Sequence, residues 1–307
     1  MDIKLPAIKS IEETLETELD FNFTINEHKI NTLGEFYDEI KKPFDDRGRQ
    51  IFYRGERVND PKRVLTPTML RNKDDILKNG EAYVEIDYNY LINYYREKGD
   101  YLNFYTYVFG NASKYRLFEL CSFSQHYLDR SPFVDFTKSL YVALSFALKQ
   151  RQVFNDDIVI YAVEINDSES YTEDLVTAEC WLHDYRVTVF NTPNKIAWQP
   201  VENRAMKSRQ VLELINNKSI KTSPTAKFID IPTNDLIKFQ QGVFLLLTDF
   251  SMFFNAYLTK NIREDFKLVK FVISKDICKD LVELIDKEAP WYQFDSVYDI
   301  SKAIKKF

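Results

Sequence analysis

Short apolar runs, bounded by polar or turn-forming residues, recur along the chain and predict the strands of a sheet. The run at 157–165 is rich in β-branched residues, which predicts a buried strand. The run at 243–247 follows two glutamines and a glycine, which predicts a central strand with polar groups where it begins. The other runs that predict strands are at 51–54, 133–136, 227–231 and 266–273.

Apolar residues at helical spacing predict helices around and between these strands. The helix at 32–42 has Thr32 in the position of an N-cap. The other predicted helices are an amphipathic lead-in within 1–27 and segments at 81–96, 101–119, 206–216, 275–287 and 296–305. We therefore predict an α+β fold with helical insertions, in which a helical lead-in at 1–44 precedes one domain at 45–307.

The junction between the strand at 133–136 and the next helix is where a ligand site is first indicated. The helix begins near Ser139, with Thr137 or Ser139 as its N-cap, and it is apolar on nearly every side. A helix N-terminus presents free N–H groups and a positive dipole end, which suit an anionic or polyhydroxyl ligand such as a nucleotide. A capped core helix that binds nothing also fits this local pattern.

Composition and charge narrow the classes of function. The formal net charge of -6 and the pI near 5.4 argue against a generic nucleic-acid coat protein. The three cysteines are widely spaced and the three histidines are scattered, so we predict no disulfide framework and no metal site. No signal-peptide pattern and no apolar run near the ~20 residues that span a bilayer are present. These features predict a cytoplasmic protein that does not contact a membrane.

Five short motifs follow one another in an order that single stretches do not reveal. They are Tyr53-Arg54-Gly55; Leu65-Thr66-Pro67-Thr68 with Arg71; Gln125-His126-Tyr127; Asp135-Phe136-Thr137-Lys138-Ser139 leading into a helix; and Gln240-Gln241-Gly242-Val243-Phe244. Together, over about residues 45–300, they resemble the FRG-domain family, which is named for a Phe/Tyr-Arg-Gly motif. Taken alone, the first motif also fits an ordinary boundary between a strand and a turn.

The resemblance implies a fold and a substrate. FRG domains look like members of the ADP-ribosyltransferase superfamily, so it implies a split mixed β-sheet core that binds NAD, as a substrate, in a cleft. The catalytic positions that it implies are Arg54, Thr137, Gln240 and Gln241. The NAD-binding positions that it implies are Tyr53, Arg54, Gly55, Arg71, His126, Tyr127, Asp135 and Ser139.

Physical roles can be given to the matched residues. Arg54 offers fixed donors to a phosphate or a ribose oxygen. Gly55, which lacks a Cβ, would let its backbone pair with the nicotinamide amide. Thr137 and Ser139 carry short hydroxyls that could fix a ribose or a neighbouring side chain. Tyr127 could stack on the nicotinamide ring, and His126 could bond a phosphate or serve only as a core histidine.

The glutamine pair departs from what transfer from NAD requires. The reaction passes through a positively charged ribose, which a carboxylate usually stabilises, and a glutamine brings no charge. A glutamine is no general base either, so that role would fall to Glu56, Asp135 or Glu202.

Two readings of the function follow. In one, the chain is an ADP-ribosyltransferase that acts as a toxin or in defence against phage. It would modify an unidentified protein or nucleic acid, and an antitoxin or regulatory partner would restrain it. In the other, it is a non-catalytic module that senses a nucleotide or binds a protein. A nuclease is poorly supported, because Asp74-Asp75 and Asp156-Asp157 fit solvated turns.

Overall fold

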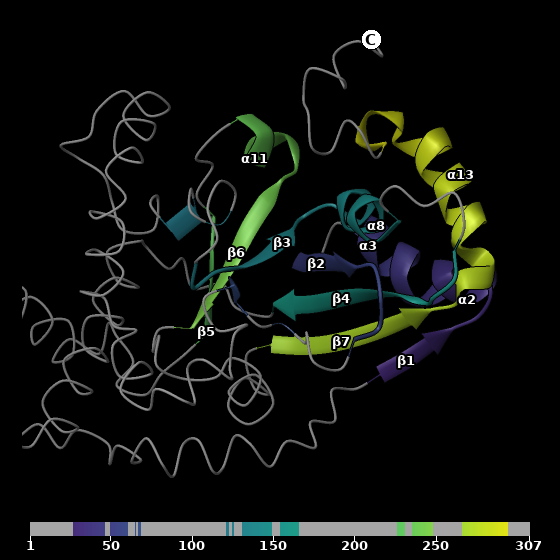
Figure 1. Ribbon diagram of the computed structural model, residues 1–307, viewed down its shortest axis with the longest axis horizontal. Helices are drawn as coiled ribbons and strands as arrows, with labels where there is room; N and C mark the ends of the chain where they lie inside the picture. The colour runs from purple at the N-terminus through teal and green to yellow at the C-terminus, as the bar shows by residue number, and fades with distance from the viewer. Residues whose placement is uncertain are drawn as a thin grey trace, which may run out of the picture.

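A mixed sheet of seven strands lies at the centre of the computed structural model, which describes residues 27–46, 50–60, 65, 67–68, 121–122, 125, 131–148, 154–165, 226–230, 235–247 and 266–293 (Figure 1). The strands are β1 Glu27–Ile30, β2 Gln50–Glu56, β3 Val134–Thr137, β4 Ile158–Ile165, β5 Ala226–Ile229, β6 Gly242–Leu247 and β7 Phe266–Ile273. Their order across the sheet is β1-β7-β4-β2-β3-β6-β5. β1 is parallel to β7, and the other neighbours are antiparallel.

Six of these strands lie at the apolar runs that predict them, and the strand at 266–273 has the predicted bounds. β1 is not predicted, because three of its four residues are exposed and only Ile30 is buried, so no apolar run marks it. It pairs in parallel with β7, Ile30 lying opposite Ile273. Part of the segment predicted as a helical lead-in is therefore an edge strand of the sheet.

The helices of the described residues lie largely where the pattern predicts them. They are α2 Leu33–Phe36, which continues through a π-helical turn at Tyr37–Lys41 into α3 Lys42–Asp45; α8 Leu140–Leu148; α11 Asp235–Phe239; and α13 Cys278–Glu288, with 3-10 turns at Lys275–Ile277 before it and Pro290–Tyr292 after it. α11 and the turn at Pro290–Tyr292 are too short for a periodic signal and are not predicted. The helices predicted at 81–96, 101–119, 206–216 and 296–305, and the lead-in before residue 27, lie outside the described residues.

Both predicted N-caps are present. The Oγ1 atom of Thr32 accepts the N–H of Glu35 at 3.2 Å, and the Glu35 carboxylate accepts the N–H of Thr32 at 3.2 Å, which is a capping box. At the start of α8, the Oγ atom of Ser139 accepts the N–H of Val142 at 3.4 Å. The sequence signals for these two helix starts are thus confirmed.

The alternation of side chains along the strands gives the sheet two apolar faces. One face, which includes Tyr53, packs against α8 and α13 and against the helices that follow β1. The opposite face, which includes Phe52, forms a second cluster with Phe136 and Tyr161. α8 lies against β2 and is buried around nearly its whole circumference, as its apolar sequence predicts (Figure 1). A residue on β2 therefore points either under the helices or toward the other face.

Candidate functional site

The sheet opens between the neighbouring strands β2 and β3. β2 pairs with β4 over its whole length but with β3 at one position only, where Tyr53 lies opposite Thr137. β3 then runs alongside β6, and Figure 1 shows β5 and β6 steeply inclined to β4 and β7. A cavity of about 1030 Å³ lies where the two central strands separate. Ligand pockets for small molecules reach roughly this size, so the opening can hold a dinucleotide.

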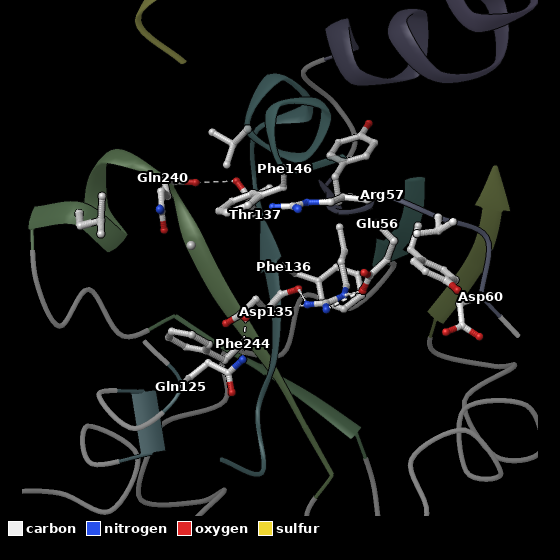
Figure 2. A pocket seen from close by; sticks show the side chains of 18 residues that line it. Glu56, Arg57, Asp60, Gln125, Asp135, Phe136, Thr137, Phe146, Gln240 and Phe244 are labelled. Atoms are coloured by element: carbon white, nitrogen blue, oxygen red, sulfur yellow. Dashed lines mark hydrogen bonds and ion pairs between the residues drawn. The ribbon is translucent and has the colours of Figure 1, made fainter. Parts of the chain in front are cut away.

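Residues from distant parts of the chain line this cavity, as Figure 2 shows. One wall consists of β2 and the segment after it, including Arg54, Glu56 and Arg57. The side chains of Asp135 and Gln125 lie at another wall. The lining also includes Val142 and Phe146 of α8, Leu236 of α11, Gln240, and Gly242 and Phe244 of β6.

Arg54 joins the two separating strands through its guanidinium. Its Nε donates to Oε1 of Glu56 at 2.8 Å, and its Nη2 lies 2.6 Å from the same oxygen. Its Nη1 donates at 2.9 Å to the backbone carbonyl of Asp135, and the Asp135 carboxylate lies 3.9 Å from that nitrogen. Because β2 and β3 no longer pair here, the guanidinium takes the place of a backbone donor at the Asp135 carbonyl.

The charges around Arg54 leave an excess of negative charge at this end of the cavity. Burial alone would lower the pKa of Arg54, but Glu56 and Asp135 raise it above its ordinary value, so the guanidinium stays charged. Burial also raises the pKa of Tyr161, with Glu56 adding to the shift and Arg54 opposing it. In the described part of the chain, one guanidinium here faces two carboxylates, which suits a ligand group that becomes positively charged.

Asp135 and Gln125 form a second polar pair in the cavity wall. Gln125 donates its amide N–H to Oδ2 of Asp135 at 2.7 Å. The other oxygen of each group, Oδ1 of Asp135 and Oε1 of Gln125, is buried and has no hydrogen-bond partner among the described residues. A buried acceptor without a donor costs about 1–3 kcal/mol. Since both groups are acceptors, an incoming N–H or O–H group that reached them would recover part of this energy.

The hydroxyls that the sequence offers as catalytic or ribose-binding groups are engaged in holding the fold together. The Thr137 hydroxyl donates to the Gln240 carbonyl at 2.6 Å and accepts the Ser139 N–H at 3.0 Å. Thr137 lines the cavity, but only 4% of it is exposed. Ser139 is 3% exposed and caps α8, and it does not line the cavity. The geometry therefore gives Thr137 a positioning role, because it ties β3 to the turn that carries Gln240.

A pair of substitutions distinguishes this positioning role from chemistry. Thr137→Val removes both hydrogen bonds while keeping the shape, and it should lower the free energy of unfolding by about 1–3 kcal/mol. Thr137→Ser keeps the hydroxyl and should lose less than half of that amount. Urea unfolding measures both variants. Equal stability of the valine variant and the wild type would contradict the bridging role.

The two glutamines point in different directions. Gln240 lines the cavity and is 6% exposed. Gln241 has a φ of 50°, in the left-handed region, and its amide donates to the Tyr292 hydroxyl at 2.9 Å. Gln241 does not line the cavity. Of the predicted pair, only Gln240 is placed where it can contact a ligand in this geometry.

The remaining predicted residues divide between the cavity and the core. Tyr53 is among the lining residues but is 1% exposed. Its ring packs against the ring of Phe44, with 5.8 Å between the ring centroids. Gly55 also lines the cavity, but a Cβ at this position would lie 1.9 Å from the carbonyl oxygen of Ala143, so its lack of a side chain is required by α8. The predicted residues Arg71, His126 and Tyr127, together with Glu202, lie outside the described residues.

Three cavity residues receive little or no weight from the sequence. Glu56 is considered only as a general base, and Arg57 and Phe146 are given no role. Because side chains alternate along a strand, the sequence could have predicted that Glu56 lies on the same side of β2 as Arg54. The positions of Arg57 and Phe146 depend on where β2 ends against α8, which no local pattern shows. Within the described residues, no group of three or more His, Cys, Asp and Glu side chains could hold a metal ion.

Comparison with known proteins supports one part of the resemblance. Residues 49–156 match the family model of the FRG domain, which covers β2, β3 and α8 and therefore the stretch that carries Arg54, Asp135 and Thr137. No curated protein and no solved structure matches the chain. Among the helices of the described residues, none has the length and apolar character needed to cross a membrane.

Proposed function

We propose that the cavity binds NAD and that the protein transfers the ADP-ribosyl group to a macromolecular acceptor. The observation that carries this proposal is the cluster at the opening of the sheet, in which Arg54 lies between Glu56 and Asp135. The cavity has the size of a nucleotide site, and six residues predicted from the FRG resemblance line it: Tyr53, Arg54, Gly55, Asp135, Thr137 and Gln240.

The cluster supplies the charge that the glutamines lack. In the reaction the bond between C1′ of the ribose and the nicotinamide nitrogen breaks, and the nicotinamide leaves with the bonding electrons. Positive charge develops on the ribose, and fixed negative groups in a partly dry site stabilise such charge more strongly than water does. Glu56 and Asp135 are the carboxylates placed to do this, and Arg54 holds Glu56 in position.

The second half of the reaction needs an acceptor. A nucleophilic oxygen, nitrogen or sulfur atom of the acceptor bonds to C1′ and gives up its proton to a base, which closes the balance of atoms and charge. Asp135 is the carboxylate proposed to take this proton, because its side chain lines the cavity and is partly exposed. We propose a protein or nucleic acid as the acceptor and a toxin or defence role, including defence against phage. An antitoxin or a regulatory partner would then restrain the activity.

The proposed activity is tested with the purified protein, labelled NAD and a cell extract. Released nicotinamide and label on a macromolecule are the expected results. One other function, a module that senses a nucleotide without chemistry, is favoured by Gln240, because this predicted catalytic position presents an uncharged side chain to the cavity. A rise in melting temperature with ADP-ribose, together with no release of nicotinamide, would establish that function and reject the transferase.

Glu56→Gln tests the observation on which the proposal rests. The amide keeps a hydrogen bond to Arg54 but removes the charge, so we expect nicotinamide release to fall about a hundredfold, with a loss of stability of about 1–2 kcal/mol. Release is measured by separating free nicotinamide after incubation with NAD. Glu283→Gln, at an exposed position of α13, is the matched control and should keep the wild-type rate. Full activity of the Glu56 variant would show that another group stabilises the ribose.

A further inference from the structure

We propose that Arg57, and not Arg54, binds the diphosphate of the ligand. This inference rests on the proposed function, in which the ligand is NAD or a related dinucleotide. It differs from the expectation from the sequence that Arg54 binds a phosphate or a ribose oxygen. Three observations carry it: the donors that Arg54 has already used, the surroundings of Arg57, and the charges at the two ends of the cavity.

Arg54 has few donors to offer a phosphate. A guanidinium has five N–H groups. The Nε–H and one Nη2–H face Glu56, and one Nη1–H is bound by the Asp135 carbonyl. A phosphate that approached the two remaining N–H groups would also approach the carboxylates of Glu56 and Asp135, and like charges at this distance repel one another. Arg54 is therefore suited to hold Glu56 and β3 rather than an anion.

Arg57 differs from Arg54 in each of these respects. It follows β2 directly, lines the same cavity and is exposed. Among the described residues, it makes no ion pair or hydrogen bond with its side chain, so its donors are available. In Figure 2 the Arg57 side chain points into the cavity toward Phe146 and away from Glu56 and Asp135. A guanidinium in this position can bind two phosphate oxygens at once.

The two arginines thus give the cavity two electrically different ends. The end at Glu56 and Asp135 carries excess negative charge and suits the ribose and the nicotinamide, which is positively charged in NAD. The end at Arg57 carries a free positive charge and suits the diphosphate. An elongated ligand with a cationic ring at one end and a diphosphate in its middle matches this order of charges, which also fixes the direction in which it binds.

The experiment measures binding of ADP-ribose and of nicotinamide riboside, which lacks the diphosphate, by isothermal titration calorimetry. Arg57→Gln should weaken ADP-ribose about ten- to a hundredfold, as expected for loss of a charged hydrogen-bonding partner. Nicotinamide riboside should bind equally to this variant and to the wild type. Arg57→Lys keeps the charge but not the two-pronged guanidinium, so its affinity for ADP-ribose should lie between those of the wild type and Arg57→Gln. Lys279→Gln, on the exposed side of α13, is the control for loss of one surface charge.

Inorganic pyrophosphate adds a second readout. It should compete with ADP-ribose for the wild type, less so at high salt because Arg57 is exposed, and it should not compete for Arg57→Gln. ADP-ribose affinity within twofold of wild type in Arg57→Gln would overturn the inference, while nicotinamide release by the wild type would leave the transferase proposal standing. Equal weakening of both ligands would also overturn it, because Arg57 would then act on the shape of the cavity. Failure of the wild type to bind ADP-ribose would overturn the inference, and failure to release nicotinamide from NAD as well would reject the proposed function.

Discussion

Gly55→Ala is expected to lower the free energy of unfolding by about 3 kcal/mol or more. The added Cβ would lie 1.9 Å from the carbonyl oxygen and 2.8 Å from the carbonyl carbon of Ala143, and 3.0 Å from the backbone nitrogen of Ala147. These are atoms of the α8 backbone, which cannot turn away as a flexible side chain can. Either α8 must move away from β2 or the strand must bend. Urea unfolding followed by circular dichroism measures the loss.

Gly34→Ala is the matched control for this prediction. An added Cβ there meets only the Thr32 hydroxyl, at 3.8 Å, which is an ordinary contact. Gly34 lies inside α2, so alanine should raise stability by up to about 1 kcal/mol. If Gly55→Ala unfolds at the wild-type urea concentration, β2 and α8 do not approach as closely as the structure has them. A large loss for Gly55→Ala with a gain for Gly34→Ala would show that the glycine of the Tyr-Arg-Gly motif serves helix packing.

The fold could be predicted where local pattern and burial agree. β4 and β7 are largely apolar, although β7 also carries Lys267 and Lys270, because neighbouring strands and both apolar clusters enclose them. β1 could not be predicted, because an exposed edge strand needs no apolar run and is held in place by its pairing with β7. α11 is five residues long, which is too short for helical periodicity to appear. Strand order and the single pairing of Tyr53 with Thr137 are long-range properties that no window of sequence contains.

The candidate site could be predicted as a set of stretches but not as a set of roles. Arg54, Asp135 and Gln240 do line one cavity, as the order of the motifs suggests. Sequence cannot show that Gln241 adopts a left-handed backbone and turns its amide to Tyr292. The sequence does offer Ser139 as an N-cap, and the structure shows that this role occupies its hydroxyl at the first turn of α8. In the proposed function, the catalytic charge comes from Glu56 and Asp135, whose proposed role depends on their distances from Arg54, and not from the predicted glutamines.

Arg54→Ala is expected to abolish nicotinamide release and to lower the free energy of unfolding by about 2–3 kcal/mol. The Arg54 side chain is 14% exposed, and its loss leaves the Asp135 carbonyl without the guanidinium donor and the Glu56 carboxylate without its cation. Removing one partner of a buried charge pair costs about 3–5 kcal/mol, and the partial exposure of Glu56, 25%, reduces this cost. Urea unfolding gives the stability, and release is assayed at a temperature where circular dichroism shows the variant folded.

The double variant Arg54→Ala with Glu56→Gln separates the cost of the unpaired charge from that of the lost contacts. A neutral amide at position 56 no longer needs a cation, so the double variant should be more stable than Arg54→Ala alone, by about 1 kcal/mol. Nicotinamide release should stay absent, because neither the Glu56 carboxylate nor the Arg54 guanidinium that positions it remains. If the double variant loses the sum of the two single losses, the Arg54–Glu56 pair is not coupled, and Arg54 stabilises the opening through the Asp135 carbonyl alone. Recovery of both stability and release in the double variant would instead place the catalytic charge on Asp135.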